Sequence, residues 1–179
     1  DVGALLGNVQ GGTTSVTDIH FARVRVQGTT VSVTDTGGDT HGGSLVGLIA
    51  DSGFQVHDVH VDATTRIAGT KSGGLVGALV NGASGGSVEH SLVSQARVDA
   101  TMMRGVCDSC SAWNVRGGLV GSLNTGGLTI QEVMTEASVF NDENADPQSS
   151  NPTSKLGGLV GEVESANVVV ANAGFRGEI

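Results

Sequence analysis

Two cysteines are the residues whose spacing points most directly to chemistry. Cys107 and Cys110 stand three positions apart, in a stretch without a helical pattern. A redox pair needs a helix N-terminus to activate its thiol, and a structural zinc site needs two further ligands that are not obvious in the sequence. The spacing therefore predicts a local disulfide that pins an exposed loop, with free thiols, or redox or metal chemistry, as alternatives. A disulfide would indicate an oxidising environment outside the cytoplasm.

A second candidate site is the acidic segment 141–146. Asp142, Glu143 and Asp146 concentrate carboxylate oxygens there, and calcium prefers such ligands. The spacing of an EF-hand and its closing glutamate are missing. We expect a solvated acidic loop, with a calcium ion held by these three residues as the alternative, and no other cofactor.

Histidines and acids alternate in the segment His57-Asp58-Val59-His60-Val61-Asp62. Strand alternation places Asp58, His60 and Asp62 on an outward face and His57 on the other. A divalent metal at His60 is one interpretation, and an ordinary polar strand face is the other. Acids also recur at comparable points of successive predicted strands, where they would form an outward ladder relieved by cations: Asp18, Asp58, Glu89 and Glu132.

No arrangement of Ser, His and Asp in the sequence indicates a catalytic nucleophile, and we predict that the protein is not an enzyme. The net charge of −9 disfavours nucleic acid as a partner. No apolar run is long enough for a membrane helix, so we expect no membrane insertion. Glycine is abundant, at 29 of 179 residues, and aromatic residues make up 3% of the chain, which indicates a narrow, regular core of aliphatic side chains.

A repeated glycine motif must position these groups. Gly-Gly-Leu-Val-Gly occupies residues 73–77, 117–121 and 157–161, and looser copies occupy 43–47 and 3–7. Each copy continues with apolar residues at period two and then a second strand-like segment, while the lengths vary just before the glycines. We predict one all-β domain over residues 1–179, a parallel β-solenoid of about five coils with loops inserted on one edge. Its repeats begin near residues 3, 43, 73, 117 and 157, and the chain is expected to be part of a longer repeat protein.

The motif assigns an expected role to each of its positions. The glycines would turn a corner with positive φ and let backbones approach, while Leu and the third Gly would face the core. The residues between them would point outward and form an apolar contact stripe, unless loops or a bend cover it: Leu6, Val46, Val76, Val120 and Val160. The neighbouring outward positions would lie at solvent: Asn8, Leu48, Ala78, Ser122 and Glu162.

The repeated Gly-Gly-Leu-Val-Gly, followed by a strand of the type Val-x-x-Val-x-x-x-Ala-x-Val, resembles the GLUG-motif repeats of secreted and surface proteins, including bacterial adhesins. The resemblance implies a right-handed solenoid used as a spacer, stalk or adhesive surface. We therefore expect a non-enzymatic structural or adhesive segment of an extracellular or cell-surface protein, such as a filament or stalk unit. Its partners would be further repeats, copies of itself, or surface glycans or proteins. The alternative is a β-helix that binds or processes carbohydrate.

Overall fold

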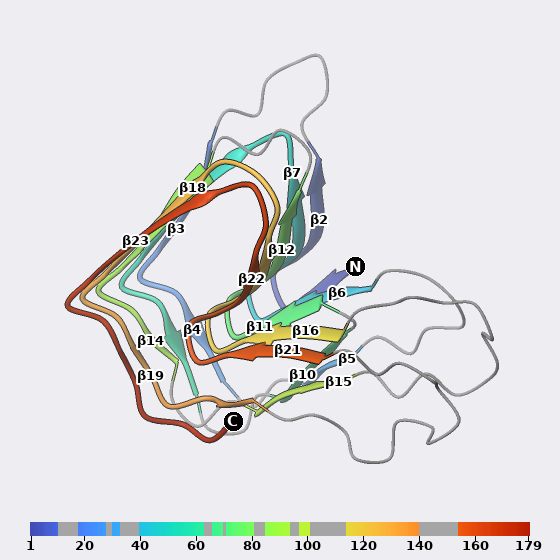
Figure 1. Cartoon of the computed structure of the whole chain (residues 1–179), viewed down its shortest axis with the longest axis vertical. Helices are drawn as coiled ribbons and strands as arrows, with labels where there is room; N and C mark the ends of the chain where they lie inside the picture. Colours follow the sequence, from blue (N-terminus) through green and yellow to red (C-terminus); the bar gives the residue numbers. More distant parts are fainter. Residues whose placement is uncertain are drawn as a thin grey trace, which may run out of the picture.

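The computed structural model describes residues 1–10, 18–27, 30–32, 40–62, 66–69, 71–80, 85–93, 97–100, 114–139 and 154–179. These residues form strands and connections only, and the strands assemble into five parallel sheets, here called A to E (Figure 1). Sheet A contains β1 (Val2–Gly3), β6 (His41–Gly43), β11 (Lys71–Gly73), β16 (Asn114–Gly117) and β21 (Ser154–Gly157). Sheet B contains β2 (Leu6–Gln10), β7 (Val46–Ala50), β12 (Val76–Val80), β17 (Val120–Leu123) and β22 (Val160–Val163).

The other three sheets complete each coil. Sheet C contains β3 (Asp18–Ala22), β8 (Gly53–His57), β13 (Gly85–Glu89), β18 (Gly127–Gln131) and β23 (Asn167–Ala171). Sheet D contains β4 (Arg25–Val26), β9 (His60–Val61), β14 (Leu92–Val93), β19 (Met134–Thr135) and β24 (Gly174–Phe175). Sheet E contains β5 (Thr30–Ser32), β10 (Arg66–Gly69), β15 (Arg97–Ala100) and β20 (Ser138–Val139).

The chain winds through the sheets in the order A, B, C, D, E in four coils, and the strands of the fifth coil belong to sheets A to D. The C-terminal coil lies nearest the viewer in Figure 1, and the chain runs anticlockwise from sheet B to sheet E, so the solenoid is right-handed. In chain order, the variable segments of the sequence stand between a strand of sheet E and the next strand of sheet A in each of the first four coils. The predicted right-handed solenoid with loops on one edge is confirmed.

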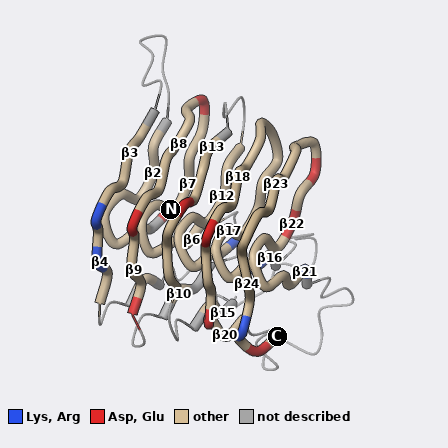
Figure 2. Tube along the Cα trace, turned by 90° about the vertical axis from the view of Figure 1, so that its left-hand side faces the viewer, with Lys and Arg blue, Asp and Glu red and all other residues tan. Residues whose placement is uncertain are grey.

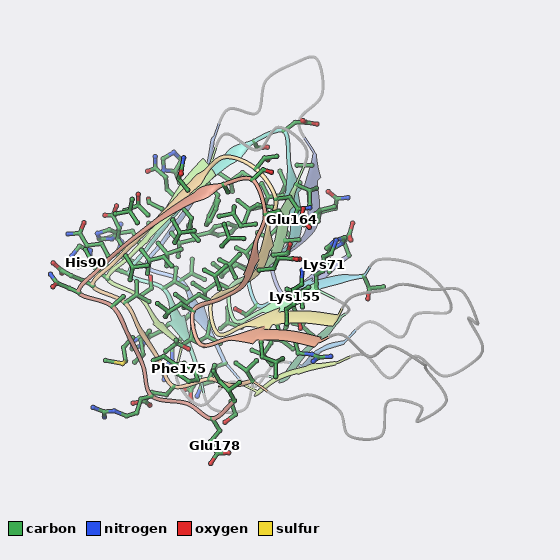
Figure 3. All side chains as sticks on the ribbon, viewed as in Figure 1. Lys71, His90, Lys155, Glu164, Phe175 and Glu178 are labelled. Atoms are coloured by element: carbon green, nitrogen blue, oxygen red, sulfur yellow. The ribbon has the colours of Figure 1, made fainter. Side chains whose placement is uncertain are left out.

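The register follows the glycine motif. The first glycine of each copy pairs with that of the next along sheet A: Gly3, Gly43, Gly73, Gly117 and Gly157. Apolar residues of the first four coils stack in columns and are almost completely buried: Leu45, Leu75 and Leu119; Ile49, Leu79 and Leu123; Val56, Val88 and Ile130; Val31, Ile67, Val98 and Val139. Each such side chain contributes about 1.5–3 kcal/mol by leaving water, and Figure 3 shows that side chains fill the space between the sheets.

The motif glycines serve close backbone approach and not positive φ. Among the described glycines, only Gly126 has a left-handed backbone, with φ of 81°. A Cβ at Gly117 or Gly118 would overlap the backbone carbonyl of Val120 or Gly158, respectively. A Cβ at Gly121 would lie 2.7 Å from the carbonyl oxygen of Ser72. The predicted positive-φ corner is therefore wrong, and so is the predicted core-facing third glycine, because that glycine packs on the backbone of sheet A.

Of the two alternatives for the column of residues between Leu and the third Gly, cover by a bend is the one found in the central coils, where no exposed stripe forms. Val46, Val76 and Val120 have 0% exposure, whereas Leu6 in the first coil is 39% exposed and Val160 in the last coil is part-buried. The cause is a bend of the backbone at the corner between sheets A and B, which occurs at Gly74 and Leu75 in the third coil.

At this bend the carbonyl of Leu119 accepts the N–H groups of both Leu75 and Val76. Gly73 pairs with Gly117 before the bend and Val76 pairs with Val120 after it, so the bend, and not an extra residue, interrupts strict alternation. Sheet A also packs on sheet B, since β11 contacts β12 and β17. For the same reason Ala78 and Ser122, predicted at solvent, are fully buried.

Candidate functional site

The corner between sheets C and D gathers the polar side chains that could do chemistry. One residue per coil has a left-handed backbone there, with φ between 48° and 56°: Arg23, Asp58, His90, Glu132 and Asn172. We call these residues the corner column. Left-handed backbone is uncommon in residues other than glycine and requires surrounding structure to hold it.

Backbone hydrogen bonds hold this corner in place. The N–H of Asp58 donates to the carbonyl of Glu89 in the next coil at 3.3 Å, and the N–H of His90 donates to the carbonyl of Gln131 at 3.1 Å. Arg23 and Glu132 make the equivalent bonds. Successive corner residues are therefore spaced by the separation of paired strands, about 4.8 Å.

The residue before the corner forms a second column at the end of sheet C. The backbone register pairs Ala22, His57, Glu89, Gln131 and Ala171 in order. In the second, third and fourth coils both columns carry polar side chains, and the buried Val56 and Val59 flank them in the second coil. Figure 2 faces this corner and shows acidic and basic residues on successive coils, and Figure 3 shows His90 at its outer edge.

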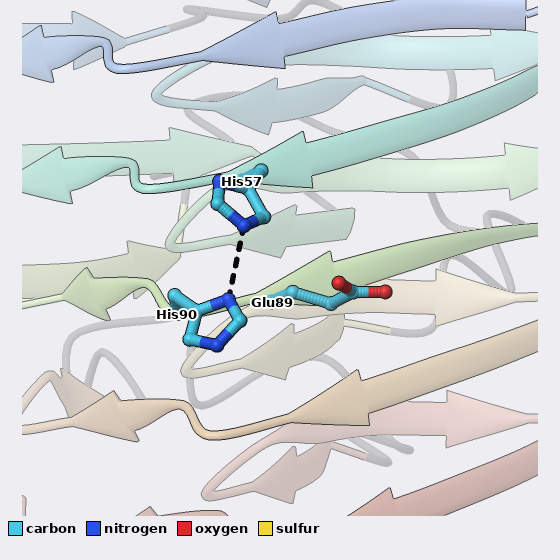
Figure 4. Close-up of side chains that lie close together, drawn as sticks. All are labelled: His57, Glu89 and His90. Carbon is cyan, nitrogen blue, oxygen red and sulfur yellow. Dashed lines mark hydrogen bonds between the residues drawn. The ribbon is translucent and has the colours of Figure 1, made fainter.

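Two histidines from neighbouring coils face one another at the corner (Figure 4). The Nε2 atom of His57 lies 3.1 Å from the Nδ1 atom of His90, and the ring centroids are 4.7 Å apart. The other nitrogen of each ring meets a carboxylate. His57 Nδ1 lies 2.9 Å from Asp58 Oδ2, and His90 Nε2 lies 2.8 Å from Glu132 Oε2. The four side chains are about half exposed and form one continuous polar chain across three coils.

Glu89 completes a cluster of possible metal ligands. One ring nitrogen each of His57 and His90 and one carboxylate oxygen of Glu89 lie within 4.8 Å of one another. Glu89 is part-buried and lies on the same strand as the corner that carries His90. Two imidazoles and a carboxylate from adjacent coils can bind a divalent metal ion or share a proton.

The histidine cluster in the structure differs from the predicted metal site at His60. His60 does not join this cluster and instead lines a pocket with Arg25, Val61, Asp62 and Leu92, where Arg25 and Asp62 form a salt bridge at 3.0 Å. His57 was expected on the face opposite Asp58, but both side chains are exposed. The expectation was wrong because the left-handed backbone of Asp58 ends the strand alternation.

The predicted acidic ladder is corrected in the same way. Asp58 and Glu132 do share the corner column, but His90 lies between them, and Glu89 belongs to the neighbouring column. Asp18 lies at the other end of sheet C, where it pairs with Gly53. The signal for this arrangement was in the sequence. In the second and fourth coils an apolar pair three residues apart encloses the two polar residues of the corner, as Val56 and Val59 enclose His57 and Asp58.

Several predicted residues lie outside the part of the chain that the structure describes. These are the cysteines and the acidic loop residues: Cys107, Cys110, Asp142, Glu143 and Asp146. The predictions of a disulfide and of a calcium site therefore stay predictions.

Comparison with protein-family models, curated proteins and solved structures finds no match for this chain. The likeness to GLUG-motif repeats is thus carried by the residues of the motif alone. Among the described residues, no helix has the length and apolar character that a membrane span requires.

Proposed function

We propose that this chain is a non-enzymatic structural or adhesive segment of an extracellular or cell-surface protein, a stiff rod that extends by stacking at its two ends. The observation that supports this function is the contrast between central and terminal coils. Leu45, Leu75 and Leu119 are fully buried, whereas Leu5 in the same column of the first coil is 48% exposed. The first described coil thus presents an apolar surface onto which a further coil could pack, either from the same protein or from another copy.

The C-terminal end has the same character. Val170 is 49% exposed, while the residues that share its column, Val88 and Ile130, have 0% exposure. The strands of the last coil, β21 to β24, are also edge strands within the described sheets. An edge strand with apolar side chains is a template for further pairing. Stacked repeats remain soluble only when such ends are capped or continued.

One end differs from the other, so copies of the chain would join head to tail. The last coil of one copy would continue its sheets onto the first coil of the next, and a contact of this kind generates an open filament. The extracellular location and the adhesive role rest on the motif resemblance. Adhesion would use the side surfaces and the loops on the edge between sheets E and A.

Sedimentation velocity and electron microscopy of the purified chain test this proposal. We expect concentration-dependent association and rods longer than a single five-coil stack, which spans about 25 Å. Val170→Lys or Leu5→Lys should abolish association because each places a charge on an end face. Met134→Lys is the matched control, since Met134 is 38% exposed on the side of the fourth coil.

Two results would contradict the proposal. One is a monomer at every concentration, and the other is equal loss of association in the Met134→Lys control. A glycan array in which the monomer binds an oligosaccharide would favour the alternative, a carbohydrate-binding β-helix.

A further inference from the structure

The protons of the histidine pair are constrained by the carboxylates beside it. A carboxylate only accepts hydrogen bonds, so the ring nitrogen that faces it must carry a proton. His57 Nδ1 faces Asp58 at 2.9 Å, and His90 Nε2 faces Glu132 at 2.8 Å. In neutral rings, the two remaining nitrogens then both present lone pairs. These two nitrogens lie 3.1 Å apart.

Two lone pairs at this distance require a positive charge between them. Either a proton or a metal ion can supply it. The neighbourhood favours a metal ion, because a third ligand is present: an oxygen of Glu89 lies within 4.8 Å of both rings. In a tetrahedral zinc site with Zn–N bonds of 2.0–2.1 Å, two nitrogen ligands are about 3.3 Å apart. The observed separation is close to this value.

We propose that His57, Glu89 and His90 bind a divalent transition metal ion, with Zn²⁺ as the reference, that bridges the second and third coils. Asp58 and Glu132 orient the two imidazoles by accepting their other N–H groups, as carboxylates commonly do behind metal-bound histidines. The fourth position faces solvent at the exposed corner and takes a water molecule. Two imidazoles and one carboxylate suit zinc, copper or nickel, whereas calcium and magnesium prefer oxygen ligands alone.

The ion would link neighbouring coils at the corner. His57 belongs to β8 of the second coil, whereas Glu89 and His90 belong to the third. The folded chain presents these ligands together and the unfolded chain does not, so binding stabilises the fold. This inference does not depend on end-to-end stacking, because the corner lies on the side of the rod.

Zinc titration of the metal-free chain by calorimetry tests the site. We expect one ion per chain and a rise in the melting temperature with zinc. His57→Ala and His90→Ala should each weaken zinc binding by more than about tenfold, and Glu89→Gln should weaken it less. His60→Ala is the matched control, since it removes an exposed histidine from the same coil and should leave the affinity unchanged. All of these chains also carry Cys107→Ser and Cys110→Ser, so that the two cysteines cannot bind zinc elsewhere in the chain.

Electron paramagnetic resonance of the Cu²⁺-loaded chain gives a second readout. Two coordinated nitrogens are expected in the parent chain and one in either histidine variant. Circular dichroism of the variants checks that the fold is intact. The proposal is overturned if the folded chain binds no zinc, or if the His57 and His90 variants bind it as tightly as the parent, in which case the histidine pair shares only a proton.

Discussion

His57 and His90 are separated by 33 positions in the sequence, yet their facing ring nitrogens lie 3.1 Å apart. Coil stacking creates this contact, because equivalent corners of adjacent coils are one strand spacing apart. The same stacking brings Asp58 and Glu132 to the outer sides of the pair. The stacking of similar coils thus brings polar residues of three coils together at one corner, between the strands of sheets C and D.

Orientation of the histidines by their carboxylates predicts the effect of Asp58→Asn. The change keeps a side chain that tolerates left-handed backbone but removes the charge behind His57. Zinc affinity should fall by about tenfold, the lower end of the range for such outer residues. Asp51→Asn is the matched control, since Asp51 is exposed and also has a left-handed backbone, with φ of 55°. Equal zinc affinity in the two variants would show that Asp58 does not support the site.

Close backbone contact predicts that Gly118→Ala is poorly tolerated. The added Cβ would overlap the carbonyl oxygen of Gly158, which belongs to the next coil. We expect a loss of about 3 kcal/mol or more in the free energy of unfolding, measured with urea. Gly127→Ala provides the comparison, because its nearest neighbour would be 3.7 Å away, an ordinary contact. Similar losses in both variants would contradict a packing role for the motif glycine.

Leu75 and Leu5 belong to the same column but differ in burial, so replacing each leucine with alanine should lower the free energy of unfolding by different amounts. Leu75→Ala removes a fully buried side chain from the third coil and should cost about 2–5 kcal/mol in the free energy of unfolding. Leu5→Ala removes the equivalent side chain from the first coil, where it is 48% exposed, and should cost about half as much or less. Chemical denaturation of dilute chain measures both. The difference should shrink at concentrations where the ends are covered by stacking.

The left-handed corner predicts opposite effects of glycine at adjacent positions. Glu132→Gly relieves an unfavourable backbone, with φ of 52°, and should raise stability by up to about 1 kcal/mol. Loss of the exposed pair with His90 offsets little of this gain. Gln131→Gly, one residue earlier in β18, should lower stability by about 0.5–1 kcal/mol, because glycine in a strand loses more freedom on folding. Thermal unfolding of the metal-free variants measures whether each substitution raises or lowers stability. Destabilisation by Glu132→Gly would contradict a strained backbone at this corner.

Most of the fold was predictable from the spacing of the motif. Gly73 and Gly117 are equivalent in the sequence and pair in the structure, and the alternation after them marks the strand of sheet B. The predicted directions of side chains were wrong where the backbone of one or two residues breaks the regular strand. The bend before Val76 and the left-handed backbone at Asp58 each reset the alternation, and a shift of one residue reverses the face of a strand side chain.

The sequence by itself determined the coils, their number and their register, because parallel pairing of identical motifs requires only that equivalent residues recur. The tertiary structure decided which side chains meet. It covered Val76 and Val120, which alternation alone would leave at solvent, and it turned His57 and His90 toward each other. Both outcomes depend on how one coil lies on the next and on local breaks in the strands, and neither is expressed in the period of the repeat.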